Sequence, residues 1–145
     1  MKLEQMLTAM VPFIGTIGLT IDAITPGAAT ATLPSRPEVH NHLGTAHAGA
    51  VYTLGESASG GAVLSIFADL MPGVFVALKE ATVRHSKARA GDVTAKATVD
   101  GDPAEIRRRF DATGKVDFTV SVTMTVDGVE TGVNTYTWAV RAPRS

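Results

Sequence analysis

One stretch of the sequence decides the fold: residues 47–68, which read HAGAVYTLGESASGGAVLSIFA. Its apolar character and length predict a helix in which Glu56 is the only charged residue, with histidine counted as neutral. A helix without a charged face is normally buried on all sides. The stretch is also rich in glycine and alanine, although each glycine costs a helix about 1 kcal/mol relative to alanine. We therefore expect a buried helix that other parts of the backbone approach closely.

Most of the remaining chain alternates apolar and polar residues, a pattern typical of strands. Asp127-Gly128 lies between two such runs and predicts a tight hairpin turn. Strands are expected at residues 17–21, 28–33, 74–85, 93–99, 118–126 and 131–141, a helix at 2–10, and a helical turn at 104–110. A single buried helix needs a sheet around it, and strands linked by hairpins form an antiparallel sheet. The sequence thus predicts one α+β domain over residues 1–145, with an antiparallel sheet wrapped around one long central helix.

Composition narrows the possible partners and the compartment. The formal net charge of −1 gives no basic field for nucleic acid or an anionic membrane. The chain contains no cysteine, which excludes disulfides and thiolate chemistry and fits a reducing compartment. Residues 1–7 place Glu4 among apolar residues and do not resemble a signal peptide, and no run has the profile of a membrane span. We expect a cytoplasmic protein that binds neither nucleic acid nor membrane.

The segment before the central helix has the features of a catalytic site. Residues 41–49 lead into the helix N-terminus, where free backbone N–H groups and the helix dipole favour negative charge. A thioester carbonyl placed there gains stabilisation as it becomes an oxyanion, and small residues at Ala48 and Gly49 allow it to approach. Glu56 lies nine residues after His47, about 13 Å along the helix. We therefore expect a homo-oligomer, a dimer or a tetramer, in which a second subunit brings its own helix N-terminus beside Glu56.

These residues resemble a known family. Asn41-x-x-Gly44-Thr45-x-His47-x-Gly49, followed by an acid nine residues after the histidine, is similar to the phenylacetyl-CoA thioesterase-like (PaaI-type) branch of the hotdog superfamily. The later segment at residues 81–92 resembles the strand, basic turn and Gly-Asp pair of that family. The order of elements matches over nearly the whole chain. The resemblance implies a hotdog fold and acyl-CoA thioesterase activity, with coenzyme A as part of the substrate and no other cofactor.

The resemblance also implies roles for particular residues. Glu56 of one subunit would act as general base on water or as a nucleophile, and Asn41 would orient the water or the substrate. His47 would brace the loop at the helix start, and the N–H of Ala48 would polarise the thioester carbonyl. Apart from the resemblance, His47 can be simply a hydrogen-bond donor at the helix start. The family often has a glycine at position 48 and a hydroxyl near the acid. Substrate contacts are expected from Gly49, Ser59, Gly60, Phe75, Arg84, Lys87 and Arg89.

Other interpretations of the same residues remain open. Glu56 can be a structural carboxylate at a dimer interface, Asn41 a turn cap, and the basic residues at 84–89 a solvated turn instead of a site for the phosphates of coenzyme A. His42 lies fourteen residues before Glu56, the spacing of some hotdog dehydratases and hydratases. A third alternative is an acyl-CoA-binding module without turnover, favoured by alanine at position 48. A metal site at the loop histidines is not expected, because the loop lacks a suitably placed carboxylate.

Overall fold

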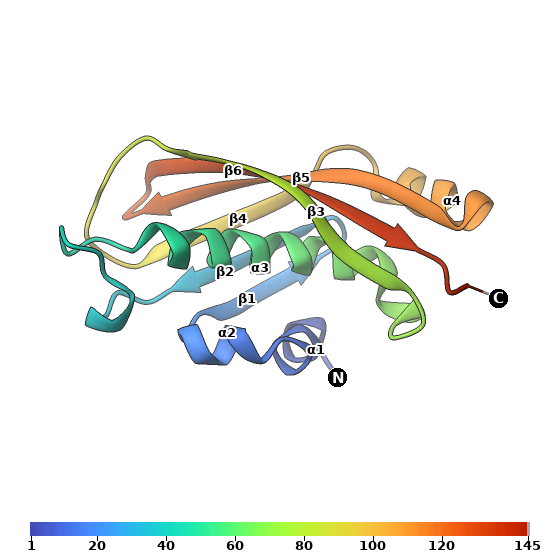
Figure 1. Ribbon diagram of the computed structural model, residues 1–145, viewed down its shortest axis with the longest axis horizontal. Coiled ribbons are helices and arrows are strands. Elements are labelled where there is room, and N and C mark those ends of the chain that lie inside the picture. Colours follow the sequence, from blue (N-terminus) through green and yellow to red (C-terminus); the bar gives the residue numbers. More distant parts are fainter. Residues whose placement is uncertain (145) are drawn as a thin grey trace.

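The computed structural model describes residues 1–144 and has one long helix lying across a curved sheet (Figure 1). Its elements are α1 (Leu3–Met10), α2 (Pro12–Ile17), β1 (Thr20–Thr25), β2 (Ala28–Leu33), the 3-10 turn η1 (Pro37–Val39), α3 (Ala48–Phe67), the 3-10 turn η2 (Ala68–Leu70), β3 (Phe75–His85), β4 (Val93–Val99), α4 (Pro103–Thr113), β5 (Lys115–Val126) and β6 (Val129–Arg141). The central helix and the strand regions therefore agree with the sequence prediction.

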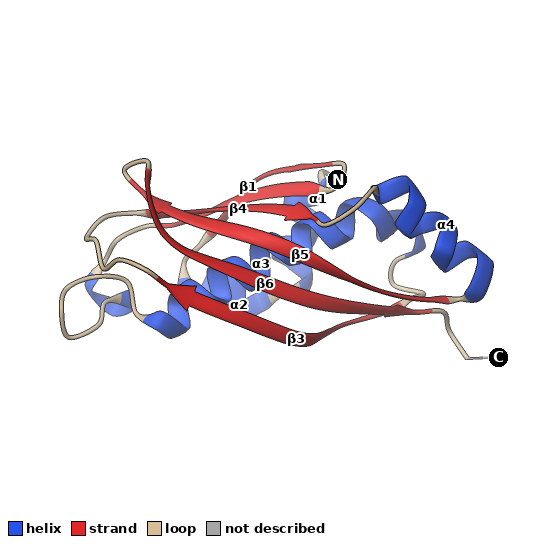
Figure 2. Ribbon diagram, turned by 90° about the horizontal axis from the view of Figure 1, so that it is seen from above, coloured by secondary structure: helices blue, strands red, loops and turns tan. Residues whose placement is uncertain are grey.

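The six strands form one antiparallel sheet in the order β1-β2-β4-β5-β6-β3. Figure 2 shows the strands from above, with α3 running beneath them and α4 beyond one end of the sheet. The inner faces of β4, β5 and β6 are buried in strict alternation, as expected for a sheet with one face on the core. β3 and β1 form the two edges, and β3 is largely exposed along its length.

Helix α3 lies close to the sheet because it lacks side chains at the points of contact. A Cβ atom on Gly55 would lie 2.5 Å from both the Met124 Cε and the Tyr136 hydroxyl oxygen, and one on Gly61 would lie 3.0 Å from the Ala29 Cβ. The close backbone approach predicted from the composition of this helix is thus confirmed. Within residues 1–144, α3 and the other helices lack the combination of length and apolar character that spans a bilayer.

Two local predictions had wrong bounds. The strand expected at residues 17–21 begins later, at Thr20, and continues to Thr25, because helix α2 extends to Ile17 and Gly18 ends it with a φ of 76°. The helical turn expected at residues 104–110 is part of a longer helix, because α4 spans 11 residues. The Asp102 carboxylate caps this helix by accepting a hydrogen bond from the Ala104 N–H at 3.0 Å. Gly114 ends it in the left-handed conformation.

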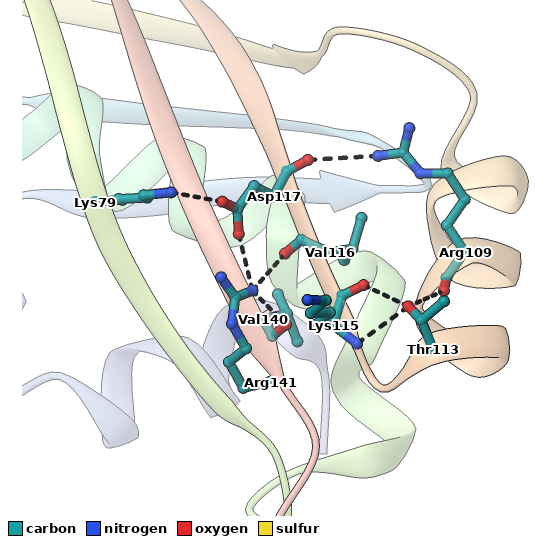
Figure 3. A network of polar contacts seen from close by, with 8 residues as sticks. All are labelled: Lys79, Arg109, Thr113, Lys115, Val116, Asp117, Val140 and Arg141. Carbon is teal, nitrogen blue, oxygen red and sulfur yellow. Dashed lines mark hydrogen bonds and ion pairs between the residues drawn. The ribbon is translucent and has the colours of Figure 1, made fainter.

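Three strands are joined at one end of the sheet by the carboxylate of Asp117 on β5 (Figure 3). It accepts a hydrogen bond from Lys79 of β3 at 2.7 Å and pairs with Arg141 of β6 at 2.8 Å. The bond from Lys79 and the charge of Arg141 together hold the pKa of Asp117 below its usual value. This network fixes the edge strand β3 onto the sheet near the C-terminal end of β6.

Candidate active site

The loop before α3 is organised by the side chain of Asn41. Its Oδ1 accepts hydrogen bonds from the backbone N–H groups of Leu43 and Thr45, at 2.9 and 3.1 Å. Its Nδ2 donates to the Thr45 hydroxyl at 2.9 Å, and the Asn41 N–H donates to the Thr45 carbonyl at 2.8 Å. Gly44 has a φ of 74° and lets the chain turn within this short loop. Asn41 thus sets the position at which the chain enters α3.

His47 is the N-cap of α3, and its role as a brace of the helix start is visible directly. Its Nδ1 accepts a hydrogen bond from the Gly49 N–H at 2.9 Å, and its own N–H donates to the Val39 carbonyl at 2.8 Å. The side chain is therefore an acceptor at the helix start, not the donor expected from the sequence. A neutral imidazole is required for this cap, because a protonated Nδ1 cannot accept.

The first N–H group of α3, that of Ala48, is free for a ligand. Within the described part of the chain no protein group accepts from it, whereas the next N–H, from Gly49, is occupied by His47. Ala48 is exposed and lines a cavity of about 300 Å³. The helix dipole adds to the positive potential at this point. A free N–H at the edge of this cavity is a donor suited to a carbonyl oxygen that gains negative charge.

Basic side chains line the same cavity. Arg84 at the end of β3 and Lys87 and Arg89 in the following loop contribute to its wall, together with Asn41. Figure 1 shows this loop at the end of the molecule where α3 begins. Arg89 pairs with Asp127 at 3.9 Å, a distance at which an exposed pair is weak. The structure thus brings the predicted basic turn beside the helix N-terminus, an arrangement suited to an anionic ligand.

A second cavity, of about 340 Å³, contains the predicted catalytic acid. Glu56 and Gly60 of α3 line it, and most of the remaining wall is apolar, with Trp138 of β6 on the sheet side. Burial raises the pKa of the Glu56 carboxyl above its usual value. Within residues 1–144 no hydrogen bond or ion pair reaches this carboxylate. An unpaired carboxyl in an apolar cavity is costly to ionise, and such groups gather at functional sites.

The other predicted contacts lie outside both cavities. Ser59 is fully buried. Its hydroxyl donates a hydrogen bond to the backbone carbonyl of Glu56 at 2.8 Å and accepts one from the Trp138 Nε1–H at 3.0 Å. Gly49 lies beside His47, and Phe75 begins β3 with 64% of its surface exposed. His42 is exposed in the loop and lines neither cavity, so one chain does not bring it to Glu56. Among the described residues no three His, Cys, Asp or Glu side chains gather at one point.

Two polar residues that sequence reasoning did not select are buried at the cavities. Ser57 contributes to the wall of the Glu56 cavity and Asn134 to that of the basic cavity. The Ser57 hydroxyl oxygen and the Asn134 Oδ1 are buried, and neither atom has a partner among residues 1–144. The orientation of Asn134 is fixed, because its Nδ2 donates to the Tyr136 hydroxyl, which itself donates to the Tyr52 carbonyl. A signal for Asn134 exists in the sequence: it is a polar residue on the inward face of an alternating strand.

The predicted site residues therefore fall into two groups on one chain. Asn41, Ala48 and the basic residues surround the N-terminus of α3, and Glu56 with Gly60 lies in the other cavity. Eight residues separate Ala48 from Glu56, which is about 12 Å along the helix. The two groups cannot act on one reacting carbonyl within a single copy of the chain.

The architecture defines the fold of the protein, the hotdog fold, as the sequence resemblance implied. The family model that matches residues 2–140 is the domain of unknown function DUF4442, and the chain belongs to this family. Among curated proteins none matches the sequence.

Three solved structures illustrate the likeness of fold. A protein of unknown function from Pseudomonas aeruginosa, described as a probable thioesterase, is 22% identical with a TM-score of 0.83, over 97% of this chain and 93% of the other. A thioesterase family protein from Silicibacter pomeroyi is 24% identical with a TM-score of 0.72, over 99% and 97%. A variant of the phenylacetic acid degradation protein PaaI from Thermus thermophilus is 21% identical with a TM-score of 0.70, over 89% and 98%.

Proposed function

We propose that this protein hydrolyses acyl-CoA thioesters to the free acid and coenzyme A, at a site shared by two copies of the chain. The observation that carries the proposal is the Glu56 carboxyl, which lies in an apolar cavity without a protein partner. A raised pKa makes a carboxylate a stronger base near neutral pH, which suits a general base. The likeness to proteins named thioesterases supports the same reaction class.

The second copy supplies what one copy lacks. Ala48 of one subunit and Glu56 of the other would face the same carbonyl, so that the 12 Å between them along one helix is no obstacle. The exposed edge strand β3, 11 residues long, offers a free row of backbone groups for an interface between copies. We therefore propose a homodimer, or a tetramer built from such dimers.

The proposed reaction uses one water molecule. The Ala48 N–H donates to the thioester oxygen. Glu56 removes a proton from water while the water oxygen attacks the carbonyl carbon. The tetrahedral intermediate then collapses, the carbon–sulfur bond breaks, and Glu56 returns the proton to the departing sulfur. The products are the free acid and the coenzyme A thiol. Arg84, Lys87 and Arg89 would bind the phosphates of coenzyme A at the mouth of the basic cavity.

The test is release of free thiol from short, medium, long and aromatic acyl-CoAs. We expect wild type to release thiol and Glu56→Gln to lose at least about a hundredfold in kcat, the usual contribution of a general base. Glu105→Gln is the matched control, because Glu105 is exposed on α4 and pairs only with Arg108 among the residues described. Equal rates for wild type and Glu56→Gln would overturn the proposal.

The same experiment separates the alternatives. Hydration of a crotonyl thioester that is lost in His42→Ala would favour a hydratase, although the structure keeps His42 out of the Glu56 cavity. Tight binding of acyl-CoA without thiol release would instead favour a binding module.

A further inference from the structure

The Glu56 cavity is built from three parts of the chain, one of which is the N-terminal pair of helices. Leu7, Val11 and Ile14 of the α1–α2 segment form one wall, opposite α3 and the inner face of β3 and β6. Figure 1 shows α1 and α2 folded back alongside α3 and β1. Leu7 and Ile14 are buried, whereas Met10 is 45% exposed and lies at the rim. The first helices of the chain therefore close a cavity whose acid comes from the central helix.

The cavity has a polar end and an apolar end. Glu56 marks the polar end. Phe67, eleven residues further along α3, marks the apolar end, about 16 Å away along the helix axis. A ligand with one polar group followed by a hydrocarbon chain matches this arrangement, with its polar group beside Glu56.

We propose that this cavity holds the alkyl chain of the acyl group, and that the α1–α2 wall sets the longest chain it accepts. This assignment rests on the proposed thioesterase function and adds the substrate class to it. At about 30 Å³ per group, the share of a water molecule in the liquid, a volume of about 340 Å³ holds roughly ten or eleven chain carbons. The preferred substrates are therefore straight medium-chain acyl-CoAs, with affinity rising up to about ten carbons and no further.

The chain contains a built-in reporter for this cavity. Trp138 is its single tryptophan, is buried, and lines the cavity, so its emission senses what fills the space. Straight-chain primary alcohols of six to fourteen carbons are suitable probes, because they carry one neutral polar group and need no turnover. We expect a saturable change in Trp138 emission, with affinity rising about fourfold per methylene until the cavity is full.

Val11→Phe tests the wall by adding volume where α1 meets α2. It should shorten the cut-off by about two carbons, both for alcohol binding and for thiol release from acyl-CoAs. Thr16→Phe is the matched control, because it places the same side chain on the exposed side of α2, away from the cavity. Met10→Ala is a second variant at the half-exposed rim, where a smaller side chain keeps the fold, and it should lengthen the accepted chain.

The outcomes separate this assignment from the proposed reaction. Thiol release with the same chain-length profile in wild type, Val11→Phe and Met10→Ala would overturn the assignment and leave the reaction standing. A cut-off near ten carbons that Val11→Phe shortens and Thr16→Phe does not, without thiol release from any substrate, would support the chain site and overturn the reaction. Affinity that rises unchanged to fourteen carbons in all variants, or alcohol binding that leaves Trp138 emission unaltered, would overturn the assignment.

Discussion

At the residue scale, the two groups proposed to act in catalysis, the Ala48 N–H and the Glu56 carboxyl, differ in their effect on the stability of the fold. The N–H of Ala48 has no acceptor within the helix, so its use as a donor to a ligand does not reduce the stability of the fold. Glu56 is a charge among apolar side chains, so its role opposes stability. The sequence indicated both positions through the spacing of a motif. It could not indicate that the cavity around Glu56 is closed by Val11 and Ile14, because that contact joins parts of the chain about 45 residues apart.

Glu56→Gln should stabilise the protein at neutral pH. Burial raises the pKa of Glu56 in the folded state above its value in the unfolded state. The folded state therefore binds the proton more tightly, and the free energy of unfolding falls as pH rises from the unfolded-state pKa to the folded-state pKa. Glutamine has no such penalty. We expect Tm at pH 7 to rise, and each 1 kcal/mol of stability corresponds to about 2–4 °C in a domain of this size. The difference in Tm between Glu56→Gln and wild type should vanish below pH 4.5, the ordinary pKa of this carboxyl. A difference in Tm that stays constant at all pH values would contradict this explanation.

Ala48→Pro should remove catalysis and preserve the fold. Proline is favoured at the first position of a helix and lacks only the N–H that no described group of the protein uses. His47 has φ −61° and ψ 139°, the extended conformation that a residue before proline requires. We expect kcat to fall about 10²- to 10³-fold with an unchanged Tm. Ala48→Gly keeps the N–H and should retain most of the activity; equal losses in both variants would exclude a role for this donor.

At the scale of elements, the central helix shows which predictions a sequence supports. The lack of a charged face in residues 47–68 predicted burial, and the abundance of small residues predicted close packing, because both properties belong to the segment itself. The strand expected at residues 17–21 was placed too early, because Pro12 and Gly18 define a short helix that extends to Ile17, and the strand begins only at Thr20. Two turns of helix and a short strand leave similar patterns over so few residues.

The glycines of α3 should differ sharply in what they tolerate. Gly55→Ala places a methyl group 2.5 Å from Met124 and Tyr136, so we expect a loss of about 1–3 kcal/mol, as for overpacked cores. Gly60→Ala is the matched control, because its Cβ would lie at 3.7 Å from the Trp138 ring, an ordinary contact. This variant should be neutral or more stable by up to about 1 kcal/mol, since alanine is the better helix former. Urea unfolding of both variants is the measurement, and equal effects would contradict the packing described.

At the scale of the whole molecule, a site shared between subunits has a numerical signature. Glu56→Gln and Ala48→Pro should each be inactive alone. If they are unfolded, mixed in equal amounts and refolded together, half of the dimers contain one copy of each, and each such dimer has one intact site of two. We therefore expect about a quarter of wild-type thiol release after mixing. No recovery, with mixed dimers shown to be present, would place the site within one chain.

The order of strands in the sheet has a consequence for the synthesis of the protein. β3 follows α3 directly along the chain, yet its one neighbour in the described sheet is β6, and 56 residues separate His85 from Arg141. A ribosome adds about 5 to 20 residues per second, so about 3 to 11 s pass between the two. Throughout that interval β3 has no strand to pair with. Chaperones would therefore find their main target on this nascent chain at β3, until the last strand emerges.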